Sequence, residues 1–134
     1  MLTNKETFFA LSTPIGRSAT ATIRINGENA LKALLQLSKE KKIDIKHAKS
    51  KLVNIYSKNN DLIDNVVTTY YKNPKSYTGE DLVEIHTHGN PTIINTLSEE
   101  LLKIGVRPAE PGEFTKTAYL NGKMDLVQAE SVLL

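Results

Sequence analysis

The sequence predicts a domain of the α+β class, in which a small sheet is packed with helices, from three observations. Some stretches alternate apolar and polar residues, which is the pattern of a half-buried strand. Others repeat apolar residues every three to four positions, as amphipathic helices do. Turn dipeptides such as Asn26-Gly27, Asn73-Pro74 and Asn121-Gly122 separate the two kinds of stretch. With 134 residues, the chain has the size of one domain and can bury a core without disulfides or metals.

Composition narrows the functional classes. The chain has no cysteine, which excludes disulfides, thiolate nucleophiles and cysteine-ligated zinc. It has no apolar run long enough to span a bilayer, and its N-terminus lacks the basic start and apolar core of a signal peptide. We therefore expect a cytoplasmic protein without a membrane partner. The formal net charge of +2 is too small to require a nucleic-acid partner.

The first two predicted strands are Thr7–Leu11 and Ala19–Ile25, separated by a turn that carries Arg17. In the second strand, alternation places Arg24 on the polar face. An arginine in mid-strand needs a partner or an anionic ligand when it is buried, because an isolated buried charge is costly. A surface arginine is the other interpretation, and the pattern alone favours it.

A helix is predicted next, capped by Asn26-Gly27 and running to about Ser38, with apolar residues at helical spacing. The stretch Lys39–Lys51 follows, with six lysines and two acidic residues. A basic tract can bind RNA by releasing counterions, which makes an RNA-binding module an alternative function. The tract has no arginine and no interleaved tyrosine, phenylalanine or tryptophan, so a solvated connection is the favoured interpretation.

A hairpin is predicted at Lys51–Tyr56 and Leu62–Tyr71, because the turn signal at residues 58–61 joins two runs of strand-forming residues. The next strand is Leu82–His88. Its alternation gives one face with Val83, Ile85 and Thr87 and an opposite face with Glu84, His86 and His88. An acid beside two imidazoles fits a ligand site, or the zinc site of a metal-dependent hydrolase if a second element supplies another ligand. It also fits a half-buried strand with a solvated outer face, which the pattern alone favours.

Two helices are predicted after this strand. Asn90 is placed to cap the first, Pro91 occupies its first position, and Gly105 stops it. The second is a short helix at Glu113–Leu120, closed by Asn121-Gly122.

A last helix is predicted where Asp125 and Gln128 have the spacing of a capping box. No stop signal precedes Leu134. We therefore expect a fragment of a longer protein, in which apolar residues such as Val132 and Leu133 are left exposed.

Two nucleotide and hydrolase motifs are absent from the sequence. No loop of the form GxxxxGK[ST] is present, and Gly122-Lys123 follows a predicted helix rather than a strand. No serine lies in a GxSxG motif. The residues alone thus lead to an α+β domain with polar groups at Arg24, Glu84 and residues 113–123.

Four stretches, which together run almost end to end, resemble the N-terminal domain of the MnmE/TrmE family of tRNA modification GTPases. They are ALSTPIGRSATATIRING (10–27), NPKSYTGEDLVEIHTHGN (73–90), RPAEPGEFTKTAYLNGK (107–123) and MDLVQAESV (124–132). The motifs are long and occur in the order of the family, which makes the resemblance specific. The sequence departs from the family pattern at Ser18-Ala19, Asn90, Thr117 and Tyr119.

The resemblance implies a protein of three parts. The first is an α+β domain with a small mixed sheet, similar to the folate-binding domain of glycine-cleavage T proteins; a helical domain and an inserted G domain follow. On this basis residues 1–120 form the folate-binding and dimerisation domain, residues 121–134 begin a truncated helical domain, and the G domain is missing. GTP and potassium are expected only in that missing domain, so we expect no GTPase activity from these residues alone.

The resemblance also implies partners and a cofactor. The family modifies C5 of the wobble uridine of certain tRNAs together with the FAD-dependent MnmG (GidA), so the implied partners are tRNA, MnmG and a second copy of the chain. The implied cofactor is a tetrahydrofolate derivative, 5-formyl- or 5,10-methylene-tetrahydrofolate. The folate-contacting positions of the family match Arg24, Glu84 and Lys123. A carboxylate such as Glu84 can accept hydrogen bonds from the adjacent N–H and amino groups of a pterin, and the two cations suit carbonyl or carboxylate oxygens.

Overall fold

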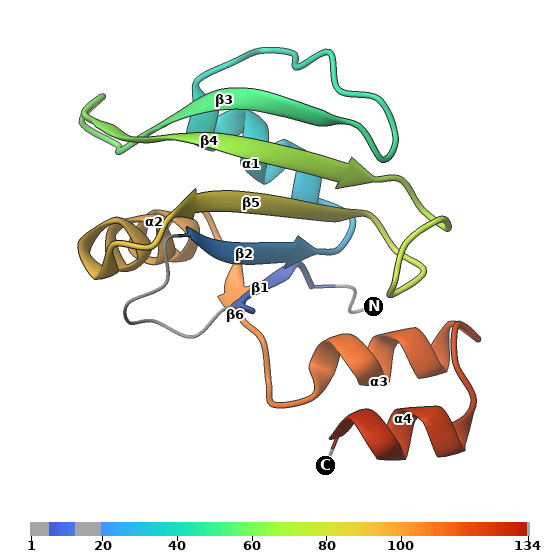
Figure 1. Ribbon diagram of the computed structural model, residues 1–134. Helices are drawn as coiled ribbons and strands as arrows, with labels where there is room; N and C mark the ends of the chain where they lie inside the picture. The colour runs from blue at the N-terminus through green and yellow to red at the C-terminus, as the bar shows by residue number, and fades with distance from the viewer. Residues whose placement is uncertain (1–5, 13–19, 134) are drawn as a thin grey trace.

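The computed structural model describes residues 6–12 and 20–133, and Figure 1 shows them as one sheet accompanied by helices. The strands within these residues are β1 (Phe8–Leu11), β2 (Thr20–Asn26), β3 (Ser50–Tyr56), β4 (Leu62–Tyr71), β5 (Leu82–His88) and β6 (Arg107–Pro108). The helices are α1 (Ala30–Ser38), α2 (Pro91–Lys103), α3 (Glu113–Leu120) and α4 (Leu126–Leu133). None of these helices is long and apolar enough to cross a membrane.

The strands lie in the order β3-β4-β5-β2-β1-β6. Every neighbouring pair is antiparallel except β1 and β6, which run parallel. The sheet is therefore mixed, and the predicted α+β class is confirmed. The predicted strand start at Ala19 and the predicted turn with Arg17 lie outside the described residues.

The strand β6 was not predicted, because it has two residues and one of them is a proline. It pairs with the start of β1, through Phe8 opposite Arg107 and Phe9 opposite Pro108. Residues about a hundred positions apart meet in this ladder, and no local pattern encodes such a pairing.

The core lies between the sheet and the helices α1 and α2. Alternation in the central strands sends Ile23 of β2 and Ile85 of β5 to this side, where the register places them directly opposite each other and both are fully buried. Leu34 of α1 and Leu97 and Leu101 of α2 are also fully buried and belong to the same cluster. Short helices are marginal on their own, and the burial of these apolar side chains against the sheet is what stabilises them.

Capping residues at α2 and α4 confirm the sequence predictions for these helices. The Asn90 side chain accepts a hydrogen bond of 2.8 Å from the backbone N–H of Thr92, and Pro91 opens α2. At α4, the side chains of Asp125 and Gln128 accept reciprocal backbone hydrogen bonds of 2.8 and 2.9 Å. These contacts satisfy N–H groups that the first turn of a helix leaves unpaired.

The prediction that Asn26-Gly27 caps α1 is wrong. The residue before α1 is Asn29, and its side chain makes no capping hydrogen bond. Asn26 instead is the last residue of β2, and its fully buried side chain bonds to Thr78 and Glu80. A buried amide must satisfy its donors and acceptor, and here Thr78 and Glu80 of a distant loop provide the partners.

The helices α3 and α4 form an antiparallel pair below the sheet in Figure 1 and contact each other. The pair is attached to the strands by Phe114, whose ring meets the ring of Phe8 edge-on at 5.0 Å. The hydroxyl groups of Thr115 and Tyr77 add a hydrogen bond of 3.0 Å. These contacts place α3 beside the sheet face that α1 and α2 leave open.

A buried carboxylate, Glu100, joins α2 to the turn between β3 and β4. Its side chain is hydrogen-bonded to the backbone N–H of Lys58 at 2.8 Å and to the ammonium of Lys103 at 3.0 Å. The bond from Lys103 is the main cause that lowers the pKa of Glu100; burial opposes it, and the Lys58 N–H adds to it. The ionised carboxylate therefore stabilises the fold.

Replacing Glu100 with glutamine is expected to reduce the free energy of unfolding by about 1–2 kcal/mol at neutral pH, because hydrogen bonds to a charged group are weakened. Folding lowers the pKa of Glu100 from its ordinary value of 4.5, so its contribution is complete above that value and is lost as the pH falls through the lowered one. Urea unfolding should show a parent–variant difference that is full at pH 7 and smaller at about pH 3. The exposed neighbour Glu99 gives the matched control Glu99→Gln. An equal difference at both pH values would contradict the role assigned to the Glu100 charge.

Candidate functional site

The open face of the sheet carries an ion pair in its centre. The register of β2 and β5 places Arg24 directly opposite Glu84. The Arg24 Nε donates to Glu84 Oε2 at 2.7 Å, and the Glu84 side chain is only 14% exposed. The mid-strand arginine therefore has a carboxylate partner, although its own side chain is 41% exposed, so it is a surface arginine held by an ion pair.

This ion pair lines a cavity of about 530 Å³. Most of the other lining residues are apolar or aromatic. They come from β1 and the residue after it, the last residue of β4, the loop before β5, the first residue of β5, and α3. The lining consists of Ala10, Leu11, Ser12, Arg24, Tyr71, Tyr77, Leu82, Glu84, Phe114 and Thr115. The volume is in the range of pockets that take small molecules, and an apolar wall around few charged groups is the usual composition of such pockets.

Lys123, the third predicted site residue, lies in a neighbouring hollow of about 450 Å³, which also has Ser76, Tyr77, Met124, Gln128 and Ser131 in its lining. Tyr77 belongs to both hollows. The structure thus brings Arg24 and Glu84 together and places Lys123 in a separate hollow that shares Tyr77 with the cavity.

Aromatic residues of the cavity were missed as site residues in the sequence. Tyr77 lies within the stretch 73–90 that carries the family resemblance, so a signal for it was present. Phe114 likewise lies within the resembling stretch 107–123, whereas Tyr71 had no signal, since it is an ordinary apolar position of its strand. The contribution of these aromatic side chains to the cavity wall depends on how α3 packs against the strands.

The histidines of β5 have separate partners. The His86 Nδ1 lies 2.9 Å from the Thr22 hydroxyl, and its Nε2 lies 3.6 Å from Glu84 Oε1. The His88 Nδ1 lies 2.8 Å from the carboxylate of Asp64, which also accepts the His88 backbone N–H. Among residues 6–12 and 20–133, no three histidine or acidic side chains are grouped so that they could hold a metal ion. The geometry gives the metal-dependent hydrolase no support.

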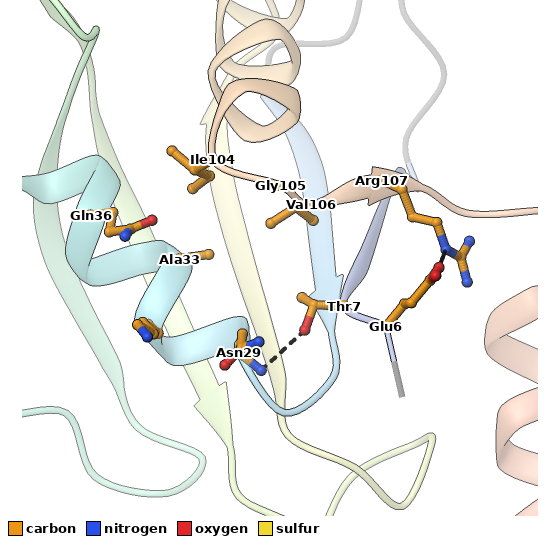
Figure 2. Close-up of a pocket in the computed structure, with 10 residues that line it drawn as sticks. Glu6, Thr7, Asn29, Ala33, Gln36, Ile104, Gly105, Val106 and Arg107 are labelled. Carbon is orange, nitrogen blue, oxygen red and sulfur yellow. Dashed lines mark hydrogen bonds and ion pairs between the residues drawn. The ribbon is translucent and has the colours of Figure 1, made fainter. Parts of the chain in front are cut away.

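A further hollow of about 480 Å³ lies between α1 and the turn from α2 to β6 (Figure 2). The Thr7 hydroxyl accepts the backbone N–H of Asn29 at 3.0 Å there. Figure 2 shows Arg107 directed toward Glu6, away from α1.

The charges beside this hollow serve the fold. Two nitrogens of Arg107 donate to the carboxylate of Glu113 at 2.8 and 2.6 Å. These bonds raise the pKa of Arg107 further and lower the pKa of Glu113, although burial opposes both shifts. The Nε and both terminal nitrogens of Arg107 donate to Glu6 and Glu113, whereas Arg24 donates to Glu84 through Nε. The cavity on the open face, with Arg24 and Glu84, is therefore the better candidate site.

Comparisons with known proteins agree on one family. Residues 7–123 match the family model described as "GTP-binding protein TrmE N-terminus". The proteins named tRNA modification GTPase MnmE from Fervidobacterium nodosum, Nitrosomonas eutropha and Aquifex aeolicus are 47%, 46% and 44% identical to the chain. The alignments cover 97%, 96% and 96% of the chain, but only 29%, 28% and 28% of these relatives. The chain thus spans less than a third of their length.

The fold and the cavity define a small α+β domain that presents an ion-paired pocket on the open face of a mixed sheet. The chain belongs to the MnmE/TrmE family and corresponds to its N-terminal domain. The predicted family is therefore confirmed.

Proposed function

We propose that the domain binds a tetrahydrofolate derivative, 5-formyl- or 5,10-methylene-tetrahydrofolate, in the open-face cavity. The observation that carries this proposal is the largely buried carboxylate of Glu84 among the apolar and aromatic side chains of that cavity. A pterin presents an N–H and an amino group side by side, and one carboxylate can accept both. The one-carbon unit belongs to the folate, so the protein supplies binding and orientation.

The two cations would serve different parts of the ligand. Arg24 is fixed by its hydrogen bond to Glu84, so its remaining N–H groups could reach a carbonyl oxygen of the same ring system. Lys123 lies in the hollow that shares Tyr77 with the cavity, and an elongated ligand that extends from the cavity into this hollow would bring a carboxylate there. This arrangement supports a ligand that is flat at one end and acidic at the other.

Calorimetric titration with 5-formyltetrahydrofolate tests the proposal directly. Saturable binding with one ligand per chain is expected. The absence of a binding signal from a chain with a cooperative unfolding transition would contradict folate binding by this domain.

For the whole protein we propose the activity that the relatives' names describe, tRNA modification by a GTPase, in the cytoplasm. Residues 1–120 would supply folate binding and dimerisation, and residues 121–134 the start of a helical domain. An FAD-dependent MnmG partner and the C5 position of the wobble uridine are part of this proposal. GTP and potassium would be bound by a G domain outside these residues.

We expect no GTP hydrolysis by the 134-residue chain, because the sequence has no GxxxxGK[ST] loop to hold the phosphates. Phosphate release measured with potassium and magnesium present should equal the rate without protein. Turnover that follows the chain through two different purification steps would show that this expectation is wrong.

We also propose that the domain forms a homodimer. Light scattering over a dilution series should give a discrete mass of two chains. Exposed apolar residues on α4, such as Val127 at 75% exposure, could cause other association, so Val127→Ser is the control and should remain dimeric. A mass of one chain at high concentration would contradict the dimer.

The RNA-binding alternative retains one supporting observation. All six lysines between residues 39 and 51 are exposed. RNA bound through these lysines would lose affinity steeply as salt rises, whereas folate binding should depend on Glu84. A titration with tRNA at two salt concentrations separates these functions.

A further inference from the structure

A buried amide holds the loop before β5 against the end of β2. The Asn26 side chain is fully buried. Its Oδ1 accepts a hydrogen bond from the hydroxyl of Thr78, and its Nδ2 donates to Glu80 Oε1 at 3.0 Å. Thr78 is also fully buried, so this side of the loop is fixed by satisfied polar groups that exclude water.

The other side of the same loop is bonded to the turn between α3 and α4. The Asn121 Nδ2 donates to the backbone oxygen of Thr78 at 2.9 Å and to Glu80 Oε2 at 3.2 Å. The two oxygens of Glu80 thus join Asn26 of the sheet to Asn121 of the turn. This chain of contacts connects elements almost a hundred residues apart.

Gly79 brings this loop into direct contact with Lys123. Its φ of +82° is in the left-handed region, and an added Cβ would lie 2.9 Å from the Cβ of Asn121. The same Cβ would lie 3.4 Å from both Cγ and Cε of Lys123. The close approach of Asn121 is therefore what requires a glycine at position 79, and the aliphatic part of Lys123 lies at ordinary contact distance from an added Cβ.

We propose that Asn121 is a positioning residue for ligand binding, which fixes Lys123 beside Tyr77 by bonding the α3–α4 turn to Thr78 and Glu80. This inference rests on the proposed folate function. A lysine loses considerable rotamer freedom when it is held in one position. With the turn already fixed, the backbone of Lys123 and its aliphatic stem beside Gly79 are positioned during folding, so less ordering of this side chain remains for the binding step.

A double-mutant cycle on folate affinity tests this role, with the variants Asn121→Ala, Lys123→Ala and the two combined. Asn121→Ala is expected to weaken 5-formyltetrahydrofolate binding about tenfold, the factor that corresponds to about 1.4 kcal/mol. In the Lys123→Ala background the same change should have an effect of less than about twofold, because the residue acts through Lys123. Asn121→Asp, which keeps the size but replaces the donor with a charge that repels Glu80, should weaken binding at least as much as Asn121→Ala. The exposed turn residue Asn59 gives the control Asn59→Ala, with unchanged affinity.

Amide hydrogen exchange measures the same contact without any ligand. The backbone N–H groups of Gly122 and Lys123 bond to Tyr119 and Ala118, and they should exchange faster in Asn121→Ala, while β2 and β5 stay protected. Unchanged exchange, or an equal loss of affinity with and without Lys123, overturns the inference. A parent chain that binds no folate overturns the proposed function instead, so the two failures are distinguishable.

Discussion

Glu84→Gln is expected to weaken the binding of 5-formyltetrahydrofolate by roughly ten- to a hundredfold, or about 1.5–3 kcal/mol. The substitution keeps the shape of the side chain and one acceptor, but it replaces the other carboxylate oxygen with a donor. That NH₂ group would face either the donors of the pterin or the Nε of Arg24, which now donates to Glu84 Oε2. A buried donor without an acceptor then adds to the loss of two charge-assisted hydrogen bonds.

His86→Ala is the matched comparison, because His86 shares the strand face and lies next to Glu84. Its hydrogen bond goes to Thr22, and it does not line the cavity. We expect an affinity within about twofold of the parent, since no charged contact to the ligand is lost. Calorimetric titration of both variants is the measurement. Binding by Glu84→Gln that matches the parent would show that the assignment of Glu84 is wrong.

Much of the fold could be predicted because local patterns and long-range packing agree. The alternation in β5 assigned Val83 and Ile85 to the covered face, and both are fully buried. Where local and distant partners compete, prediction failed. Asparagine is a residue type typical of a helix cap, but the buried side-chain amide of Asn26 bonds to Thr78 and Glu80 of a distant loop instead.

The candidate site was predictable only in part. Alternation placed Arg24 and Glu84 on polar faces of two strands, but their ion pair depends on the register between strands sixty residues apart. The family resemblance added Lys123, which the structure places in a separate hollow that shares Tyr77 with the cavity of that pair. The cavity wall from α3 depends on tertiary packing, which residue patterns do not encode.

Gly27→Ala is expected to destabilise the fold by about 2–5 kcal/mol, combining backbone strain with overpacking. Gly27 has a φ of +131°, a conformation that residues with a Cβ rarely adopt. An added Cβ would lie 2.8 Å from the Cα of Thr7 and 2.7 Å from its Oγ1. The backbone of Thr7 cannot rotate away as a flexible side chain could. Moving it would also disturb the hydrogen bond that the Thr7 hydroxyl accepts from the N–H of Asn29 at the start of α1.

Gly122→Ala separates the two causes, because Gly122 also has a positive φ, of +73°, but an added Cβ would meet no atom within 4 Å. It should cost only the backbone term of about 1–2 kcal/mol. Equilibrium unfolding in urea gives both free energies, and the excess for Gly27→Ala measures the close approach of Thr7. Equal destabilisation by the two variants would mean that β1 can shift away from Gly27 at little cost. In that case the close contact between the start of β1 and the turn after β2 would not be needed for the stability of the fold.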